Sequence, residues 1–457
     1  MIFSFLKYIH PIDYFNLKKQ DGTTVFPDPD QLPEIVRSKL TLDTGYQTSL
    51  AQKRDLAWQA IQKGFIGDAE TLSWDENLAL VDEYRFVRKY FHRLWPYYIL
   101  FIRTLTFHNP IKEFLAFYRS RKTPRVNIYQ HPIVYDDWDR FEGDLVRQAP
   151  KVSVIIPTLN RYSYLKDVLH DLEAQDYANF DVIVIDQSDP FQRTFYDDFA
   201  LNIQVIYQAE REICLARDTA ILASDSEYLL LFDDDSRVKS DWLRNHLKCL
   251  DYFKAEISAG TSISVIGARV PEAYRHLKLS NQIDTGNVML KREVFHHIGL
   301  FDRQLEKIGL EDAELGLRAY LAGFLNVSNP FSQRLHLKAG TGGFREIGIW
   351  DGLRSAKWFA PRPTPSFLYI GRKYYGSAPS IYSLLTTVPP SLIPIQYKRN
   401  KKLLFLGYFL FLFAFPVVFF QVIASWYIAG KKIKEGPKIK SISVASLNKF
   451  NAERAVR

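Results

Sequence analysis

The chain has 457 residues, of which 47% are hydrophobic and 24% are charged, a composition typical of globular proteins and unlike that of disordered chains. This length predicts two or three domains. Only two cysteines are present, Cys214 and Cys249, which excludes a disulfide-stapled secreted scaffold and a cysteine-ligated zinc site. Any metal would therefore be held by oxygen or imidazole ligands.

The excess positive charge lies near the end of the sequence. The formal net charge is +8, yet residues 398–457 hold 12 basic and 2 acidic residues, which leaves 47 basic and 49 acidic residues elsewhere. A nucleic-acid-binding domain would show a basic excess of its own. We therefore expect no nucleic-acid partner.

Residues 1–147 are expected to form a mostly helical accessory region without chemical motifs. A helix is predicted over residues 74–95. The aromatic segment 94–122 ends in basic residues, which suits a helix lying at a membrane interface. Packing of this segment against the next domain would explain the same pattern equally well.

After Pro150 the pattern changes to short β-rich runs that alternate with helical segments, which predicts a parallel α/β sheet with crossover helices. The predicted strands are residues 152–156, 181–186, 203–207 and 228–232, and the predicted helices are residues 163–174 and 213–223. This Rossmann-like half has no GxGxxG turn, which disfavours a dinucleotide dehydrogenase. The domain is expected to occupy residues 148–345.

Three carboxylates, Asp233, Asp234 and Asp235, directly follow the predicted strand 228–232. Ligands of open α/β sheets bind beyond the carboxyl ends of the strands, and adjacent carboxylates repel one another unless a cation or protons compensate. Side chains alternate along an extended segment, so Asp233 and Asp235 can face one divalent ion while Asp234 points elsewhere. We therefore predict Mn²⁺ or Mg²⁺ at this strand end.

Four blocks in order resemble family 2 of the inverting glycosyltransferases, which have the GT-A fold. The blocks are VSVIIPTLNRYSYL, VIVIDQSD, ARDTAILASDSEYLLLFDDDS and TGNVMLKREVFHHIGLFDRQLEKIGLEDAELGLRAYLAG. The resemblance covers residues 151–343 and implies an α/β, Rossmann-like domain that binds a nucleotide-sugar donor. Asp233 and Asp235 would be its metal-binding DxD motif. The remaining donor-binding positions that it implies are Pro157, Thr158, Asn160 and Arg161 in the first loop, Asp186 at the base, Arg217 at the diphosphate, and Asp234.

The segment GLEDAELGLRAYLAG is predicted to form a helix that begins at Glu311 and stops at Gly323. The resemblance implies that Asp312, beside Glu311, is the general base that takes the proton of the acceptor hydroxyl. A helix start fixes the position of such a base, but its dipole lowers the pKa. Partial burial or the charge of Glu311 must therefore raise the pKa of Asp312.

In the segment RLHLKAG, the cationic or imidazole side chains of Arg334, His336 and Lys338 alternate with leucines. The resemblance implies that His336 is a further metal ligand, and an imidazole would favour manganese over magnesium. The glycine-rich loop 339–344 has the freedom to fold over the donor. Trp350, in the predicted acceptor region 346–400, is a candidate for the border of the acceptor pocket.

Residues 403–429 form an uncharged run between the basic segments KRNKK and KKIK, within a predicted membrane segment and basic tail at 401–457. A continuous helix of this length would exceed the hydrocarbon core of a bilayer, about 30 Å. Pro416 divides the run into halves that are each too short to span. Both flanks are basic, so a single pass and a hairpin with both ends in the cytosol stay open, with electrostatics favouring the hairpin.

These features predict a metal-dependent inverting glycosyltransferase, associated with the membrane and with its catalytic domain in the cytosol. The acceptor would be a hydroxyl of a lipid-linked or cell-envelope glycan. One alternative is a processive polysaccharide synthase, although the sequence has LRSAKW at 353–358 in place of a QxxRW motif and only one long apolar run. The other is a catalytically inactive, membrane-bound adaptor that uses the fold to hold partners.

Overall fold

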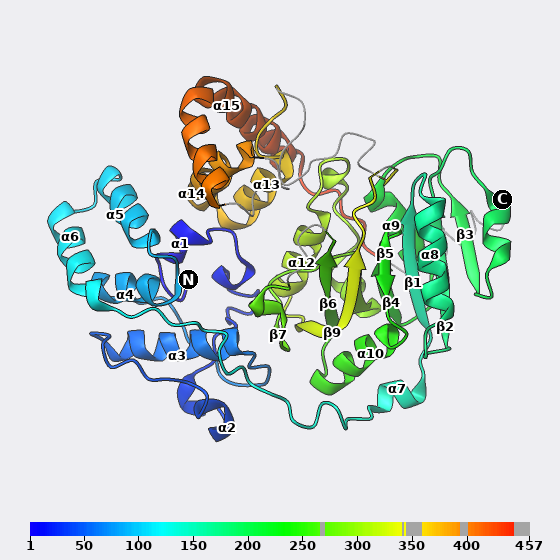
Figure 1. The fold of residues 1–457 in the computed structure, drawn as a ribbon, viewed down its shortest axis with the longest axis horizontal. Coiled ribbons are helices and arrows are strands. Elements are labelled where there is room, and N and C mark those ends of the chain that lie inside the picture. The colour runs from blue at the N-terminus through cyan, green and yellow to red at the C-terminus, as the bar shows by residue number, and fades with distance from the viewer. Residues whose placement is uncertain (266–269, 341, 344–358, 394–400, 443–457) are drawn as a thin grey trace. The chain divides into compact units, whose positions relative to one another are not determined.

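The computed structural model describes residues 1–265, 270–340, 342–343, 359–393 and 401–442 (Figure 1). Trp350 and the segment 353–358 therefore lie outside the described residues. The chain divides into two compact units. Unit 1 comprises Met1–Tyr135 and Tyr375–Thr386, and unit 2 comprises Asp136–Tyr374 and Thr387–Arg457. The predicted domain boundary at residue 147 falls inside unit 2.

Unit 1 is helical, as expected for the accessory region. Its helices are α1 (Leu6–Ile9), α2 (Glu34–Arg37), α3 (Ser49–Lys63), α4 (Leu80–Tyr90), α5 (Trp95–Leu105), α6 (Pro110–Arg119) and α14 (Ser377–Thr387). Its core is aromatic, and the rings of Phe3 and Phe86 stack with their centroids 3.8 Å apart. Such pairs stabilise a core beyond the area that they bury.

The helix predicted over residues 74–95 is wrong at its start, because α4 begins only at Leu80. The residues before it are held by tertiary contacts instead of helical hydrogen bonds. Lys18 lies 2.8 Å from Asp75, and Nη2 of Arg54 donates to the carbonyl oxygen of Glu76 at 2.9 Å. These partners are distant in sequence, so helical periodicity could not reveal them.

The single helix expected over residues 94–122 is also wrong, because the segment folds as two helices, α5 and α6; its place at a membrane interface stays a prediction. The chain turns at Phe107, whose φ is 60°. Asn109 then caps α6 by accepting from the backbone N–H groups of Ile111 and Lys112 at 3.1 and 3.0 Å, and Pro110 occupies the first helical turn. An Asn cap followed by proline is a strong helix start. We call residues 95–119 the α5–α6 hairpin.

The core of unit 2 is a nine-stranded mixed sheet in the order β3-β2-β1-β4-β8-β6-β9-β5, with β7 paired to β9. The first four strands of this order are parallel, and β8 is antiparallel to β4. The strands are β1 (Val152–Thr158), β2 (Phe180–Asp186), β3 (Ile203–Tyr207), β4 (Tyr228–Phe232), β5 (Ser236–Val238), β6 (Ile257–Ser264), β7 (Lys278–Leu279), β8 (Asn287–Lys291) and β9 (Asn326–His336).

Helices accompany this sheet in Figure 1, with α9 beside β1 and β2, α8 beside β5, and α10 beside β6 and β9. The helices of unit 2 are α7 (Asp144–Gln148), α8 (Tyr162–Glu173), α9 (Ile213–Ala223), α10 (Trp242–Phe253), α11 (Arg292–Ile298), α12 (Glu311–Leu321), α13 (Pro365–Ile370) and α15 (Lys401–Glu435). The predicted strands and helices of residues 152–232 are confirmed. The predicted α/β class with a mostly helical N-terminal region is confirmed as well.

The apolar run near the C-terminus lies in α15, a continuous helix of 35 residues that contains Pro416. The hairpin that electrostatics favoured is therefore wrong, because the chain does not reverse at Pro416. A proline removes one backbone hydrogen bond and kinks a helix, but neighbouring structure can satisfy the freed carbonyl group. Among the described residues, α15 is the one helix that is long and apolar enough to cross a membrane.

Candidate active site

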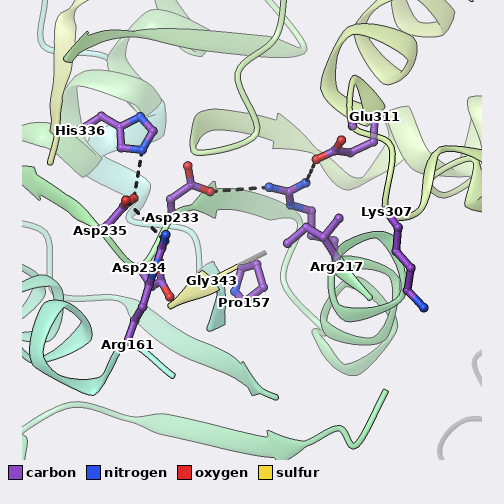
Figure 2. A pocket seen from close by; sticks show the side chains of 12 residues that line it. Pro157, Arg161, Arg217, Asp233, Asp234, Asp235, Lys307, Glu311, His336 and Gly343 are labelled. Carbon is purple, nitrogen blue, oxygen red and sulfur yellow. Dashed lines mark hydrogen bonds and ion pairs between the residues drawn. The ribbon is translucent and has the colours of Figure 1, made fainter. Parts of the chain in front are cut away.

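The acidic strand end is built by β4, whose five residues are all buried, and by β5, which begins at Ser236. An apolar strand anchored between β1 and β8 fixes where its polar continuation emerges. Asp233, Asp234 and Asp235 follow at this edge and line one pocket. Figure 2 shows their side chains diverging towards different cationic partners.

Asp233 is held by two arginines. Nη1 of Arg334 donates to its Oδ2 at 2.7 Å, and Nη2 of Arg217 lies 3.6 Å from its Oδ1. Burial disfavours the charged form, but the two guanidinium groups hold the pKa of Asp233 below its usual value. Arg334 is 2% exposed and also donates to Asp284 at 2.9 and 3.0 Å, so it joins two carboxylates.

Asp234 points away from its neighbours towards the first loop of the sheet. Its Oδ2 accepts from Oγ1 of Thr158 at 2.8 Å, and its Oδ1 accepts from Nη1 of Arg161 at 2.9 Å. Burial raises the pKa of Asp234 to about 6 despite the nearby Arg161. Thr158, Arg161 and Asp234 thus form one buried cluster that fixes the first loop to the acidic strand end.

Asp235 lies beside His336, because β5 pairs with β9 in antiparallel register and brings Ser236 opposite His336. Nε2 of His336 is 3.1 Å from Oδ1 of Asp235. Burial opposes ionisation, but the hydrogen bond and charge of His336 lower the pKa of Asp235 to about 2. The backbone N–H of Ala339 also donates to its Oδ2 at 3.0 Å.

Asp233, Asp235 and His336 fit a divalent cation. Each offers one ligand atom, and these three atoms lie within 4.8 Å of one another. Two carboxylates and one imidazole are suitable ligands for manganese, and the carboxylates alone suit magnesium. The alternation predicted for the acidic segment matches this arrangement, since Asp234 stands outside the cluster.

Arg217 connects the acidic strand end to the start of α12. It is 4% exposed on α9, and its Nη1 donates to Oε1 of Glu311 at 2.8 Å (Figure 2).

Burial, followed by the charges of Glu311 and Asp284, raises the pKa of Asp312 to about 7. A carboxylate with this pKa is a competent proton acceptor near neutral pH.

Asp186, predicted at the nucleobase, Asn160, predicted in the first loop, and Asp312, the predicted base, are not among the residues that line the pocket. Asp186 at the end of β2 is fully buried, and its Oδ2 accepts from the hydroxyl groups of Tyr162 and Tyr196 at 2.8 and 2.7 Å. Asn160 has a φ of 54° and joins the loop after β2 through Ser188. Among the predicted donor residues, those that line the pocket are Pro157, Arg161, Arg217 and Asp234.

Sequence reasoning missed several residues of this pocket. Lys307 and Gly309 line it and stand just before Glu311, within the resemblance block but without a motif of their own. Gly286 is equally important, because a Cβ atom there would lie 2.1 Å from Nη1 of Arg334 and from Oδ2 of Asp233. Only a tertiary structure reveals such a close approach.

Comparison with known proteins shows that residues 153–303 match the family described as Glycosyl transferase family 2. The putative teichuronic acid biosynthesis glycosyltransferase TuaG of Bacillus subtilis is 28% identical over 106 residues, 22% of this chain and 41% of that protein. The O-antigen biosynthesis protein RfbC of Myxococcus xanthus is 24% identical over 260 residues, 49% of this chain and 20% of that protein. The putative colanic acid biosynthesis glycosyl transferase WcaA of Escherichia coli is 28% identical over 107 residues, 22% of this chain and 37% of that protein. The chain thus spans less than half the length of each of these relatives.

Solved structures resemble this chain more distantly than these relatives do. The mannosyltransferase PcManGT from Pyrobaculum calidifontis, in complex with GDP-Man and Mn²⁺, is 16% identical over 70% of this chain and 86% of that chain, with a TM-score of 0.36. Residues 1–349 of S. aureus TarS in complex with UDP-GlcNAc are 17% identical over 51% of this chain and 66% of that chain, with a TM-score of 0.35. Likeness at this level carries no functional argument.

Proposed function

We propose, on the premise that residues 153–303 belong to glycosyl transferase family 2, that this protein transfers a sugar with inversion from a nucleotide-sugar donor to a hydroxyl group. The observation that carries this proposal is one pocket that is lined both by three candidate cation ligands and by Glu311, the chain neighbour of the proposed base Asp312. Asp233, Asp235 and His336 line one part of it, and Glu311 lines another.

The donor diphosphate would occupy the cationic side of the pocket. Arg217 and Lys307 both line it, and Arg217 is fixed by its bond to Glu311, so its guanidinium group needs little reorganisation when an anion binds. A divalent cation bound by Asp233, Asp235 and His336 would offset the negative charge of the leaving diphosphate. Pro157 and Arg161 form the neighbouring wall of the pocket.

Asp312 would act as the general base. It follows Glu311 in the first turn of α12, and its pKa of about 7 lets it take a proton from an acceptor hydroxyl at neutral pH. One carboxylate in this role is sufficient for inversion, because the acceptor oxygen attacks the sugar opposite the leaving nucleotide without a covalent enzyme intermediate.

The acceptor would be a cell-envelope or lipid-linked glycan. Three relatives carry names that refer to teichuronic acid, O-antigen and colanic acid biosynthesis, and these support an envelope polysaccharide as the acceptor class. The apolar helix α15 supports attachment to the membrane, with the catalytic unit in the cytosol where nucleotide sugars are found.

The test is a panel of nucleotide sugars incubated with the purified, detergent-solubilised full chain, with and without a chelator. We expect metal-dependent release of the nucleoside diphosphate with one donor, and an inverted anomeric configuration in the product when a glycan acceptor is supplied. Full activity in excess chelator would contradict the cation site. Binding of a donor without any hydrolysis or transfer would instead favour the inactive adaptor.

A further inference from the structure

We infer that α15 lies along the cytosolic leaflet of the membrane as an in-plane helix and does not cross the bilayer. This inference rests on the proposed membrane attachment and deepens it, because it names which face of the helix meets lipid and where its two ends lie. All residues that carry it belong to unit 2.

The chain after α15 returns to the catalytic unit. The backbone N–H of Leu300 donates to the carbonyl oxygen of Lys440 at 2.8 Å, and the N–H of Lys438 donates to Oδ1 of Asp302 at 2.9 Å. Ile442 is 7% exposed and belongs to the hydrophobic core of the sheet. The C-terminal end of α15 is therefore on the same side of any membrane as the active site.

The middle and C-terminal part of α15 is covered by the segments on both sides of α13. Nε of Arg362 donates to Oε1 of Gln421 at 3.1 Å, and Oγ of Ser425 donates to the carbonyl oxygen of Pro363 at 2.7 Å. Arg372 donates to the carbonyl oxygen of Trp426 at 2.7 Å. In a crossing helix, Arg362 would lie inside the hydrocarbon core, where an arginine is costly.

The N-terminal part of α15 is covered by the same body. Nη1 of Arg362, which contacts Gln421, also donates to the carbonyl oxygen of Ser391 in the short 3₁₀ helix η9 (Pro389–Leu392). A Cβ atom at Gly407 would lie 2.9 Å from Ile393, so this glycine lets the backbone of α15 approach the end of η9 closely. Protein therefore follows one side of the helix along most of the apolar run.

The two sides of α15 differ in how far their side chains are exposed. The side chains at helical spacing on the open side are 48–73% exposed and are Phe409, Phe413, Phe420, Ile423 and Tyr427. The residues on the covered side are small or polar in the main and are Gly407, Val418, Gln421, Ser425 and Ala429. The exposed apolar side chains also include Leu412 (69%), Phe415 (49%) and Phe419 (49%), so a broad apolar surface of α15 lies open beside its protein-covered side and can enter the acyl boundary of one leaflet.

Charge at both ends supports the same placement. The sequence has KRNKK before the apolar run and KKIK after it. An in-plane helix keeps both clusters at the anionic cytosolic surface, where each basic residue favours binding by about fivefold. A crossing helix would carry one cluster to the opposite side, against the usual bias of basic residues towards the cytosol.

The topology test uses single cysteines in the full chain, expressed in intact bacterial cells. Cys214 and Cys249 are both buried and are replaced by alanine to give a cysteine-free background. The reporters are Asn400→Cys, which lies outside the described residues, Lys431→Cys at the other end of α15, and Asp198→Cys as an exposed control on the catalytic unit. A membrane-impermeant maleimide should label none of them in sealed cells and all three after permeabilisation. Labelling of Asn400→Cys or Lys431→Cys in sealed cells overturns the inference.

A depth measurement separates an in-plane helix from one that dips into the bilayer and returns. Environment-sensitive fluorophores are attached to Phe409→Cys, Phe413→Cys, Phe420→Cys and Tyr427→Cys in the full chain, reconstituted into vesicles that contain anionic lipid. Quenching by spin-labelled lipids should place all four labels at the same shallow depth, about 5–10 Å below the headgroups. A deep label at Phe413→Cys, about 15 Å from both surfaces, with shallow labels at the ends contradicts the inference.

The same samples distinguish failure of this inference from failure of the proposed attachment. Vesicle flotation reports attachment, whereas labelling and depth report topology. Protein that does not float with vesicles, in the presence or absence of anionic lipid, contradicts both. Protein that floats but shows a deep or externally labelled α15 contradicts only the in-plane placement.

Discussion

Globular proteins usually bury apolar side chains and expose charged ones. Two regions of this protein do the reverse, each in its own way: the acidic strand end of unit 2 and the α5–α6 hairpin of unit 1. The strand end buries charge: Asp233, Asp234 and Asp235 each lie beside an arginine or histidine within the chain. The hairpin exposes apolar surface, with Phe107 96% and Ile111 69% exposed. Buried charge is costly unless paired, and exposed apolar surface marks a contact with something outside the chain.

The two regions are stabilised in different ways. The strand end is largely paired within the chain, through Arg334 at Asp233 and Arg161 at Asp234, so most of its geometry is set before a ligand binds. The hairpin has its own buried pair, Arg103 with Glu113 at 2.7 Å, which fixes the two helices to each other while their apolar side chains face outwards. The pocket at the acidic strand end is thus preorganised for a ligand. The hairpin, held by its own ion pair, presents an apolar surface.

The largest expected effect is loss of transfer when the cation site loses a carboxylate. Asp233→Ala and Asp235→Ala should each lower kcat by about a thousandfold, because a charge-stabilising group is removed from the leaving-group side. Asp198→Asn, an exposed acid of the same unit, is the matched control. Initial rates over a range of Mn²⁺ and Mg²⁺ concentrations measure the effect. Wild-type rates in either alanine variant would show that the cation site lies elsewhere.

Removal of the proposed base should affect chemistry and leave binding intact. Asp312→Asn should lower kcat about 10²–10⁴-fold, since this is the usual contribution of a general base. Calorimetry should show unchanged affinity for the nucleotide. In the wild type, kcat should rise with pH through about 7, as Asp312 loses its proton. A flat pH profile would assign the proton transfer to another group.

The same variant should gain stability at high pH. The pKa of Asp312 is raised from 3.8 to about 7 on folding, so the folded wild type loses stability as pH rises from about 4 to 7. Asp312→Asn lacks this loss and should be more stable above pH 7, by on the order of 2 kcal/mol after allowance for partial exposure. Thermal unfolding at pH 5 and pH 8 measures the difference, and equal differences at both values would contradict the raised pKa.

Removing a buried arginine from the strand end tests how much stability its ion pairs with the nearby carboxylates contribute. Arg334→Met leaves Asp233 and Asp284 without their shared guanidinium group and should cost about 3 kcal/mol in the free energy of unfolding. Arg237→Met removes a surface arginine that lies 2.8 Å from Asp171, and should cost about 1 kcal/mol or less. Chemical denaturation of both variants makes the comparison. Equal losses would show that burial adds nothing to the role of Arg334.

A single methyl group added at Gly286 should displace side chains at the acidic strand end. Gly286→Ala places a Cβ atom 2.1 Å from atoms of both Arg334 and Asp233, so these side chains must shift, with a loss in kcat/KM of about a hundredfold. Gly67→Ala in unit 1 is the control, because among the described residues its Cβ atom would meet only ring atoms of Phe65, at 3.3 and 3.4 Å. Steady-state kinetics of the two variants measure this loss. Similar values of kcat/KM for both variants would mean that the acidic strand end tolerates displacement of its side chains.

The smallest effect on the fold is expected at the hairpin. Phe107→Ser and Ile111→Ser remove exposed apolar surface, so the free energy of unfolding should change by about 0.5 kcal/mol or less. If the hairpin lies at a membrane interface, as the sequence suggested, the double variant should float less completely with anionic vesicles at high salt. Ile35→Ser, at an exposed isoleucine of α2, is the control. A large loss of stability would mean that these side chains are covered by protein.

Local sequence determined much of unit 2. The apolar runs predicted β1 to β4 and α9 because their side chains pack within one sheet and its helices. The acidic triplet and the Glu311 helix start were visible because strand ends and helix caps have short, local signals. The roles of Asp186, Asp312 and His336 came only from the resemblance, and they stay predictions for experiment.

Only the tertiary structure decided which charges meet and which apolar surfaces stay open. Asp284 and Arg334 are 50 residues apart and joined by their side chains, and Gly286 leaves room for Arg334 to reach Asp233. The turn at Phe107 divides one apparent helix, and the tail after α15 returns to the strand core through Ile442. These outcomes depend on contacts between distant segments. Periodicity within a window reports burial of a face, but not the partner that buries it.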